Sequence, residues 1–341
     1  MLRKRETVTL KDIATRTGFS VNTVSKALRG KEDISLQTRE IIRRTAAEMG
    51  HVSNALAASL RLGYTDTIAV ILGDIANPHF AILMKEIQVR AREHGYTSIL
   101  FNTNEDPQME LDAIQAALNK NVDGILICPS QNSPENLQYL QRTGVPFVLI
   151  GRHENEYPSV VCDDEAGGYL AAKTLLDAGH RKILCLHGAL YISSAKERLA
   201  GFRRAFAEMG LTPDEALIQE VSISAQGCTS VLDALAAKDL QYTAIFAFSD
   251  LLAWDAWCYL QSHGKQVPQD CSIVGFDHIQ SRLNLPLSLT SISSYKGQMS
   301  TSAVELLVEL IKNGEPSVHT PLQTVIPTAL AEGNSVATAK E

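Results

Sequence analysis

The chain has 341 residues, of which 45% are apolar and 20% charged, and its net charge at pH 7 is −7. These values are typical of a globular protein with about two to three domains, and the lack of any run of about 18 apolar residues excludes a membrane-spanning helix. The N-terminus lacks an apolar secretion signal and the six cysteines form no CxxC pair, so we expect reduced, buried thiols in a cytoplasmic protein.

Charge is divided unevenly along the chain. Residues 1–65 hold 12 Lys and Arg against 6 Asp and Glu, whereas the remainder holds 19 against 32. A basic module followed by an acidic one indicates that the first part binds a polyanion and that the second has another task.

Residues 7–50 predict three short helices. Thr9 can cap the first helix with Asp12 as its reciprocal partner, and Gly18 follows its end. Ser20 begins the second helix, and the third covers about residues 35–49. We expect these helices to form a compact headpiece over residues 1–50.

The second predicted helix, within GFSVNTVSKALRG, has one narrow apolar edge. On a helical wheel Val24 and Leu28 mark that edge, and the opposite edge carries Asn22, Lys26 and Arg29. Amide and cationic groups read base edges and bind phosphates, and a helix, a glycine turn and a polar-faced helix form the helix-turn-helix pattern. On periodicity alone, an ordinary surface helix in a small bundle fits equally well.

From Thr67 onward short apolar runs such as TIAVILGDI, VDGILICPS and SIVGF alternate with amphipathic stretches, for example over residues 80–94 and 170–179. This alternation predicts the α/β class, with parallel sheets covered by helices on both faces. The runs fall into two groups on either side of about Asp163, so we expect two doubly wound subdomains with a cleft between them. The expected boundaries are a linker over 51–65, a core over 66–335 (an N-subdomain of about 66–163 plus 295–323 and a C-subdomain of about 164–291 plus 324–335) and a tail over 336–341, with fraying from about Ala331.

Loops that follow the predicted strands are candidate ligand sites, because such folds bind ligands at the carboxyl ends of their strands. The segments GDIANPHF, Gly151–Arg152, Ser249–Asp250 and Phe276–His278 follow strands, and ISSAKER opens a helix after another. Capping of the next helix explains any one of them equally well.

The stretch VTLKDIATRTGFSVNTVSKALRG resembles the headpiece of the lactose-repressor/galactose-repressor family of bacterial transcription regulators, with V-T-x-x-D-x-A and then G-x-S-x-x-T-V-S-x-x-L-x-G. The similarity continues through NPHF, VDGIL, GHRKI, RLAGF, VPQDCSIVGFD and LTSI and covers about 325 residues. It implies a helix-turn-helix headpiece followed by a core similar to periplasmic binding proteins, built from two doubly wound parallel-sheet subdomains.

By position, the resemblance places Val21, Asn22 and Lys26 in the base-reading slots of a recognition helix. Arg29 stands where the family commonly has Asn and would add or alter a phosphate contact. The other residues that the resemblance implies at DNA or as caps in the headpiece are Thr9, Ser20, Thr23 and Ser25.

The linker segment NALAASL resembles the family's hinge helix, which folds on DNA and enters the minor groove. It has good helix propensity and no core of its own, which agrees with ordering on a partner. Leu60 stands where the family inserts a leucine between base pairs, and Asn54, Ala57 and Arg61 are implied contacts beside it. Ser53 and Ala58 depart from the family pattern, which weakens the expected grip or moves it to Arg61.

The resemblance also implies an effector site in the cleft, with Arg198 and Asp277 as its principal groups. Ser249 and Gly151 replace residues that commonly pair with sugar hydroxyls, so we expect a small polar ligand, sugar-like or related, other than a simple galactoside. The full implied set is Asp74, His79, Phe80, Gly151, Ile192, Ser194, Arg198, Ser222, Ser249 and Asp277.

These features predict a ligand-responsive transcription regulator, expected to be a repressor, that binds a pseudo-palindromic operator in double-stranded DNA as a homodimer. The tail has no leucine heptad, which favours a dimer over a tetramer, and we expect the cytoplasm and, when bound, the nucleoid as its location. No nucleotide-binding or zinc-protease motif occurs, so we expect no enzyme, cofactor, metal or membrane partner. A solute-binding protein without a DNA role and a sugar-acting enzyme remain the alternatives.

Overall fold

The computed structural model describes residues 8–31, 33–51, 63–154, 156–222, 227–282, 288–314 and 322–340. The chain divides into two compact units, residues 1–65 and 66–341, which are described separately. None of the described helices is both long and apolar enough to cross a membrane.

The first unit is a bundle of three helices, α1 (Leu10–Thr17), α2 (Val21–Leu28) and α3 (Leu36–Glu48). As predicted, Thr9 and Asp12 form a reciprocal capping box at the start of α1, and Gly18 ends it with a φ of 75°. Ser20 caps α2 through the backbone N–H of Thr23. The bundle is held by a small buried core of Ile13, Ala14, Val24, Ala27, Ile42 and Ala46.

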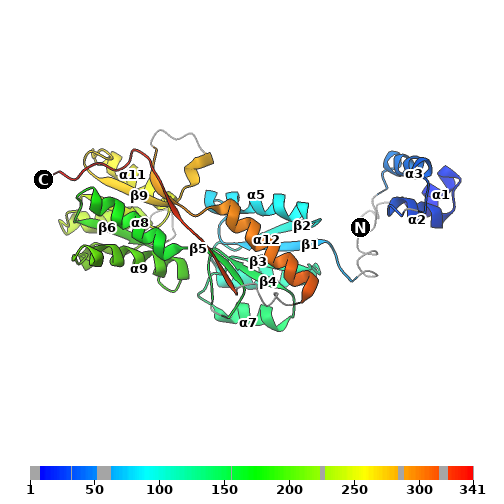
Figure 1. Ribbon diagram of the computed structural model, residues 1–341, viewed down its shortest axis with the longest axis horizontal. Coiled ribbons are helices and arrows are strands. Elements are labelled where there is room, and N and C mark those ends of the chain that lie inside the picture. The colour runs from blue at the N-terminus through cyan, green and yellow to red at the C-terminus, as the bar shows by residue number, and fades with distance from the viewer. Residues whose placement is uncertain are drawn as a thin grey trace, which may run out of the picture. The chain divides into compact units, whose positions relative to one another are not determined.

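The second unit contains two six-stranded sheets (Figure 1). The first sheet has the order β11-β5-β4-β3-β1-β2, and all of its strand pairs are parallel. Helices α5 and α12 pack on one face, and α6 and α7 pack on the other. The bounds are β1 Thr67–Leu72, α5 Pro78–Glu93, β2 Thr97–Asn102, α6 Pro107–Asn119, β3 Gly124–Ile127, α7 Pro134–Arg142, β4 Phe147–Ile150, β5 Ser159–Cys162, α12 Lys296–Asn313 and β11 Gln323–Ile326.

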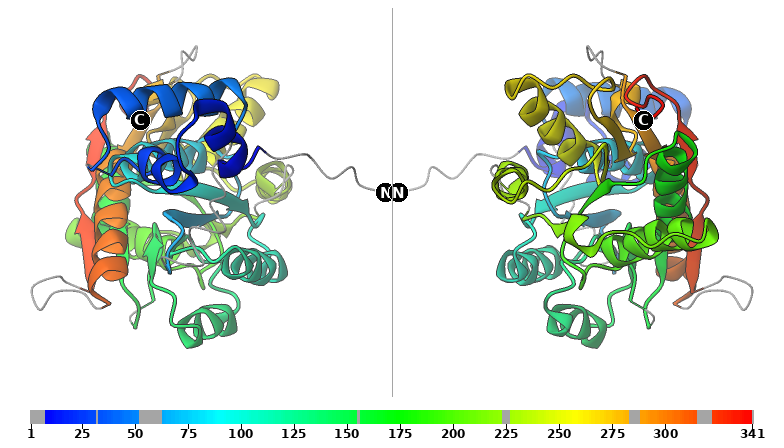
Figure 2. Two further views of the ribbon diagram at one scale, coloured as in Figure 1. Left: turned by 90° about the vertical axis from the view of Figure 1, so that its right-hand side faces the viewer. Right: turned by 90° about the vertical axis from the view of Figure 1, so that its left-hand side faces the viewer.

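The second sheet has the order β12-β10-β9-β8-β6-β7 and is parallel except for the antiparallel pair of β10 with β12. Helices α8 and α9 cover one face and α10 and α11 the other, so α8 and α11 lie on opposite sides of the sheet (Figure 2). The bounds are α8 Asp164–Asp177, β6 Ile183–His187, α9 Ser193–Glu208, η1 Glu215–Leu217, β7 Ile218–Glu220, α10 Gly227–Ala237, β8 Ala244–Ala247, α11 Asp250–Ser262, β9 Ser272–Asp277, η2 Ile279–Arg282, β10 Thr290–Ser293 and β12 Ala329–Ala331.

The backbone crosses between the two sheets three times: after β5, between β10 and α12, and between β11 and β12 (Figure 1). The third crossing corrects an expected boundary, because β11 continues to Ile326 in the first sheet and β12 begins at Ala329 in the second. The predicted change of subdomain after residue 323 therefore falls about four residues too early. Three adjacent crossings allow the two sheets to move relative to each other while remaining joined.

Three further expectations are corrected by packing. The segment after Ala331 is not frayed, since Ser335 is buried and the N–H of Ala339 donates to the carbonyl of Ala178. Cys258 is exposed, whereas the other five cysteines are buried as expected. The helix expected over residues 170–179 begins six residues earlier, at Asp164.

Helices α8 and α9 approach each other so closely that two glycines are required between them. A Cβ on Gly168 would overlap the backbone of Arg198, and a Cβ on Gly201 would overlap the carbonyl of Glu165. The close approach brings the beginning of α8 against the middle of α9, around Arg198 and Gly201. These two segments carry side chains of the site described next.

Candidate functional site

The exposed face of α2 is the first candidate site. Val24 and Ala27 attach the helix to the core, whereas Val21, Asn22 and Arg29 are exposed. A shallow depression beside the helix is lined by Asn22, Ser25, Lys26, Arg29, Lys31 and Asp33. The face therefore offers an amide, a hydroxyl and cations to an approaching surface, as the periodicity predicts.

Two of these cations already have partners. Lys26 Nζ forms an ion pair with Asp33, and Arg29 donates to the hydroxyl of Ser25. Thr9 forms the cap of α1, because its hydroxyl both accepts from and donates to Asp12. The expected contacts Asn54, Ala57, Leu60 and Arg61 lie outside the described residues.

The second candidate site is a cavity of about 340 Å³ in the second unit, lined by residues from both sheets. Nine of the ten expected effector residues line it: Asp74, His79, Phe80, Gly151, Ser194, Arg198, Ser222, Ser249 and Asp277. Ile192 does not, because it precedes α9 with its side chain 2% exposed in the core, so that expectation is wrong. The other nine form one surface although they come from distant parts of the chain.

Arg198 on α9 is the central cation of the cavity. Its Nε donates to Asp164 Oδ1 at 2.7 Å, and its Nη2 lies 3.8 Å from Asp277 Oδ1. The guanidinium carbon stacks 3.5 Å from the centre of the Phe276 ring. With one side on an aromatic ring and two carboxylates around it, the guanidinium is fixed in position before any ligand arrives.

Asp277, at the end of β9, lies against a side chain from the half that contains the first sheet. Its Oδ1 lies 3.2 Å from Nδ1 of His79, which belongs to the first turn of α5 in the first sheet's half. Burial alone would raise the pKa of Asp277, but His79, Arg198 and Lys296 lower it well below its ordinary value. The carboxylate is therefore ionised and lies between groups from opposite walls of the cavity.

The geometry can now be compared with known proteins. Residues 9–54 match the family model of bacterial regulatory proteins of the lacI family, and residues 65–330 match periplasmic binding proteins and the sugar binding domain of the LacI family. The chain belongs to the LacI family. It is a ligand-responsive, DNA-binding transcription regulator and not an enzyme.

Individual relatives agree with this placement. The chain is 33% identical over 310 residues to the HTH-type transcriptional repressor PurR of Vibrio parahaemolyticus, covering 90% of this chain and 93% of the relative. It is 31% identical over 315 residues to the ribose operon repressor of Haemophilus influenzae, covering 92% and 94%.

Solved structures share the architecture. The complex of the transcriptional regulator CelR with cellobiose has 27% identity and a TM-score of 0.72, covering 96% of this chain and 99% of that one. The lac repressor dimer bound to operator and the anti-inducer ONPF has a TM-score of 0.84, covering 97% and 100%, and at 23% identity it shows the fold alone.

Within this LacI-family cavity, the structure adds a second buried cation that was not among the expected site residues. Arg152 follows β4 and donates to both carboxylate oxygens of Glu105, at 2.7 and 2.9 Å, and to the carbonyl of Pro129. Arg152 lay in a strand-end loop of the kind that the sequence marks as a candidate. Its partner is 47 positions away, and no local pattern indicates the pair.

The rest of the lining is largely apolar. Phe248, the residue after β8, precedes the expected contact Ser249, and its position at a strand end could have indicated it. Ser249 itself caps α11, since its hydroxyl accepts from the N–H of Leu252. Apolar residues that complete the lining include Leu83, Cys128, Ile150, Cys162, Val221, Cys228, Leu251, Leu252 and Met299.

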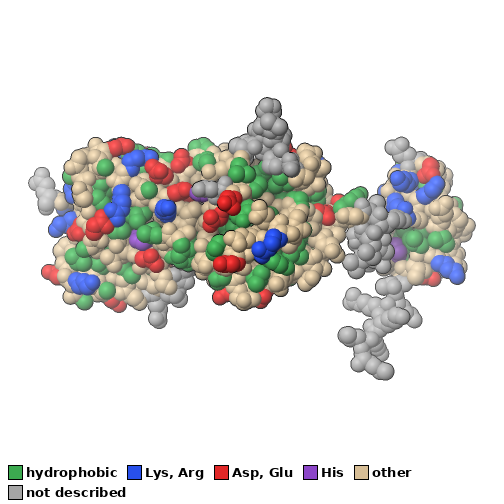
Figure 3. All heavy atoms as spheres, turned by 90° about the horizontal axis from the view of Figure 1, so that it is seen from below, with side chains coloured by type: hydrophobic (Ala, Val, Ile, Leu, Met, Phe, Trp, Pro, Cys, Tyr) green, Lys and Arg blue, Asp and Glu red, His purple; other side chains and the backbone are tan. Residues whose placement is uncertain are grey.

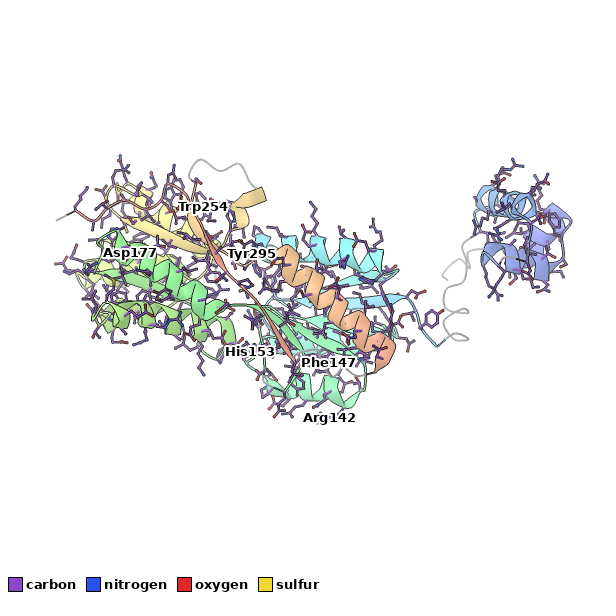
Figure 4. The ribbon with its side chains drawn as sticks, in the orientation of Figure 1. Arg142, Phe147, His153, Asp177, Trp254 and Tyr295 are labelled. Atoms are coloured by element: carbon purple, nitrogen blue, oxygen red, sulfur yellow. The ribbon has the colours of Figure 1, made fainter. Side chains whose placement is uncertain are left out.

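A set of hydrogen bonds, which we call the latch, joins the two halves beside the cavity. His153, labelled in Figure 4, follows β4, and its Nε2 contacts Glu197 Oε1 on α9 at 2.6 Å. Gln131 Oε1 accepts from the backbone N–H and the hydroxyl of Ser193 at 2.9 and 3.1 Å. These groups join the two halves along one side of the cavity.

The latch should make stability depend on pH. The hydrogen bond to Glu197 raises the pKa of His153, against the opposing effect of burial. A raised imidazole pKa stabilises the fold fully below the unfolded value of about 6.5, and the gain is lost as pH rises through the folded value. We expect Glu197→Gln to lower the melting temperature at pH 6 by an amount equivalent to about 1 kcal/mol or less, and to have little effect above pH 9.

The matched control for this melting experiment is Glu208→Gln, which removes a more exposed carboxylate from the same helix. It should leave the shape of the pH profile unchanged. An equal pH profile for the wild type and Glu197→Gln would show that the latch does not contribute.

The Lys26–Asp33 pair should weaken non-specific binding to DNA, because Asp33 competes with phosphates for the ammonium group. We expect Asp33→Asn to raise affinity for random duplex DNA about two- to fivefold at low salt, an effect that falls as salt screens the pair. Fluorescence anisotropy across a salt series measures it. Glu48→Gln, which frees Arg44 on α3 by the same charge change, is the control; an equal gain there would assign the effect to net charge.

Proposed function

We propose that this LacI-family protein is a repressor that binds a pseudo-palindromic operator as a homodimer and binds a small polar effector in the cavity between its two sheets. The observation that carries this proposal is the capped helix α2, whose exposed face presents Asn22, Ser25 and Lys26 while Val24 and Ala27 anchor it. The printed description of the lac repressor as a dimer on its operator supports the assembly. The protein works in the bacterial cytoplasm, on nucleoid DNA.

Operator reading is assigned to α2 and phosphate contact to the groups around it. Val21, Asn22 and Lys26 read base edges in the major groove, and Arg29 contacts the backbone. Two headpieces in a dimer read two half-sites. The segment 51–65 connects each headpiece to its core, and Leu60 in this segment inserts between base pairs.

Effector control follows from the three crossings between the sheets. The cavity is lined from both halves, and Asp277 and the latch hold these halves together in the closed arrangement. A ligand that prefers one relative arrangement shifts the population towards it, and a coupling of about 1–3 kcal/mol changes operator affinity about 5- to 150-fold.

The effector is a small polar molecule, sugar-like or related, and not a simple galactoside. Relatives support this class: one is named as a ribose operon repressor, and a LacI-family regulator from Enterococcus faecium was solved with bound ribose. An apolar shell with a few fixed polar groups is the usual design of such sites.

The direct test of the proposed DNA role is base selectivity. We expect Asn22→Ala and Lys26→Ala each to weaken operator binding by about 1–3 kcal/mol and to relax base preference at one position, because each removes a donor to base edges. The measurement is a gel shift against the upstream DNA and against single-base variants of the bound site.

Arg44→Ala is the control for charge, because it removes a cation from α3 rather than from α2. It should change affinity uniformly across sequences and leave base preference intact. If Asn22→Ala and Lys26→Ala behave like Arg44→Ala, α2 is not the reading helix.

A further inference from the structure

The charges around the cavity are not balanced. Its described lining contains four carboxylates, Asp74, Glu105, Asp255 and Asp277, and two guanidiniums, Arg152 and Arg198, a net of −2 when His79 is neutral. On the face of the core seen in Figure 3, by contrast, acidic and basic side chains are intermixed. The excess in the cavity has the same sign as that of residues 66–341 as a whole, which hold 32 Asp and Glu against 19 Lys and Arg.

Both guanidiniums are already engaged by protein groups. Glu105 binds Arg152 through both carboxylate oxygens, and Asp164 binds Arg198 Nε at 2.7 Å. The carbonyls of Pro129 and Phe248 accept from the remaining Nη1 atoms. An anion that bound Arg152 would have to displace Glu105 from a buried, hydrogen-bonded pair, which costs several kcal/mol.

The ammonium group nearest to these pairs is committed too. Lys296 Nζ donates to the backbone carbonyl of Asp277, and its side chain is buried. Asp277 also faces His79 and Arg198. Among the described residues of the cavity, Arg198 Nη2 is left without a hydrogen-bond acceptor, but Asp277 Oδ1 lies 3.8 Å from it, so an anion bound there would face that carboxylate.

Two carboxylates, in contrast, retain acceptor capacity on opposite halves of the protein. Asp74 follows β1, and its side chain accepts only from the N–H of Ala76 among the described residues. Asp255 lies on α11 of the other half, where its side chain is exposed, partial desolvation raises the pKa of its carboxyl, and no described group donates to it. The cavity thus presents one unneutralised acceptor from each half.

Rings and aliphatic side chains flank these acceptors. Phe80 and Phe248 come from opposite halves, with Leu83 and Leu252 beside them. Such walls suit the C–H face of a ring-shaped ligand, whose polar edge then points to the carboxylates.

We propose that the effector is a neutral or cationic small molecule with hydrogen-bond donors at both ends, that Asp74 and Asp255 bind these donors, and that phosphate esters and carboxylates are excluded. This inference rests on the proposed function, in which the same cavity is the effector site. Donation to both carboxylates would also tie the two halves together. The charge selection is thus part of the mechanism by which the ligand favours closure.

The test uses the full-length protein and matched triplets of probes, each a neutral sugar, its amino sugar and its phosphate ester, with D-glucose, D-glucosamine and D-glucose 6-phosphate among them. Thermal melting finds the binders and calorimetry measures their affinity. We expect every binder to be neutral or cationic. For the best one, Asp255→Asn and Asp74→Asn should each weaken binding roughly tenfold or more, because a charge-assisted hydrogen bond is lost.

Asp112→Asn removes the same charge from an exposed position on α6 and should leave affinity unchanged. A phosphate ester that binds best would overturn the charge selection and leave the effector site in place. A neutral or amino sugar that binds Asp74→Asn and Asp255→Asn as tightly as it binds the wild type would also overturn the charge selection. A protein that binds DNA but none of the probes would instead contradict the proposed effector site, and the inference would fall with it.

Discussion

Gly201→Ala should destabilise the core by about 3 kcal/mol or more. A Cβ at this position would overlap the carbonyl of Glu165 on α8, so the two helices must separate before the methyl group fits. Glycine in a helix interior costs about 1 kcal/mol relative to alanine, so the substitution gains that amount and still loses on balance. Urea unfolding of the full-length protein, followed by far-ultraviolet circular dichroism, measures the difference.

The same change should also reach the site. Helix α9 carries Arg198, whose Nε bonds to Asp164 at the start of α8, so separating the helices lengthens the central pair of the cavity. We expect a weaker effector response in whatever fraction of Gly201→Ala remains folded. The site is therefore positioned by the glycines as much as by its charged groups.

Gly297→Ala is the control, because Gly297 lies exposed in the first turn of α12 and a Cβ there would meet no atom within 4 Å. It should leave stability unchanged or raise it by up to about 1 kcal/mol. If both variants unfold at the same urea concentration as the wild type, the close packing of α8 on α9 does not limit stability.

The features that could be predicted from the sequence are those set by local chemistry. Thr9 and Asp12 have the spacing of a capping box, and Ser20 is of a residue type that commonly caps a helix, as it does for α2. Strand–helix alternation likewise predicts the α/β class, because both faces of each sheet are buried. Loops at strand ends then indicate where Asp74 and Asp277 converge.

The features that were missed depend on contacts between distant residues. The segment after Ala331 has few large apolar groups, yet His180 and Ser272 both bond to the backbone of Ala337 and hold it. The β11 boundary was missed because the apolar residues on either side of Pro327 resemble one continuous run. In both cases the structure of the segment is set by the residues that contact it from elsewhere in the chain, and not by its own sequence.

In the cavity, too, some residues could be predicted from the sequence and others depend on contacts between distant residues. Arg198 was expected from the resemblance, but its main partner Asp164 was not, because the helix that carries Asp164 was expected to begin only at residue 170. The resemblance also implied Ile192, which lies on the same loop as Ser194. The side chain of Ile192, just before α9, is buried in the core instead. Orientation within a loop is set by packing that sequence proximity does not report.

Arg198→Met should have the largest effect of any single change in the cavity. It keeps much of the side-chain volume but leaves Asp164, 2% exposed, without its cation, and breaking a buried pair in this way costs about 3–5 kcal/mol. Arg203→Met is the control on the same helix, because its pair with Glu215 is largely exposed and should contribute about 1 kcal/mol or less.

The loss of unfolding free energy in Arg198→Met should grow with pH. This dependence distinguishes the loss of the charge pair from the loss of packing. Burial already raises the pKa of Asp164 in the wild type, and Arg198 opposes that shift, so its removal raises this pKa further. A carboxyl whose pKa is higher in the folded state destabilises the fold as pH rises above the unfolded value of about 3.9. We therefore expect urea unfolding to show a smaller deficit at pH 4.5 than at pH 7. An equal deficit at both values would assign the effect to the lost stacking on Phe276, because that contact carries no titratable group.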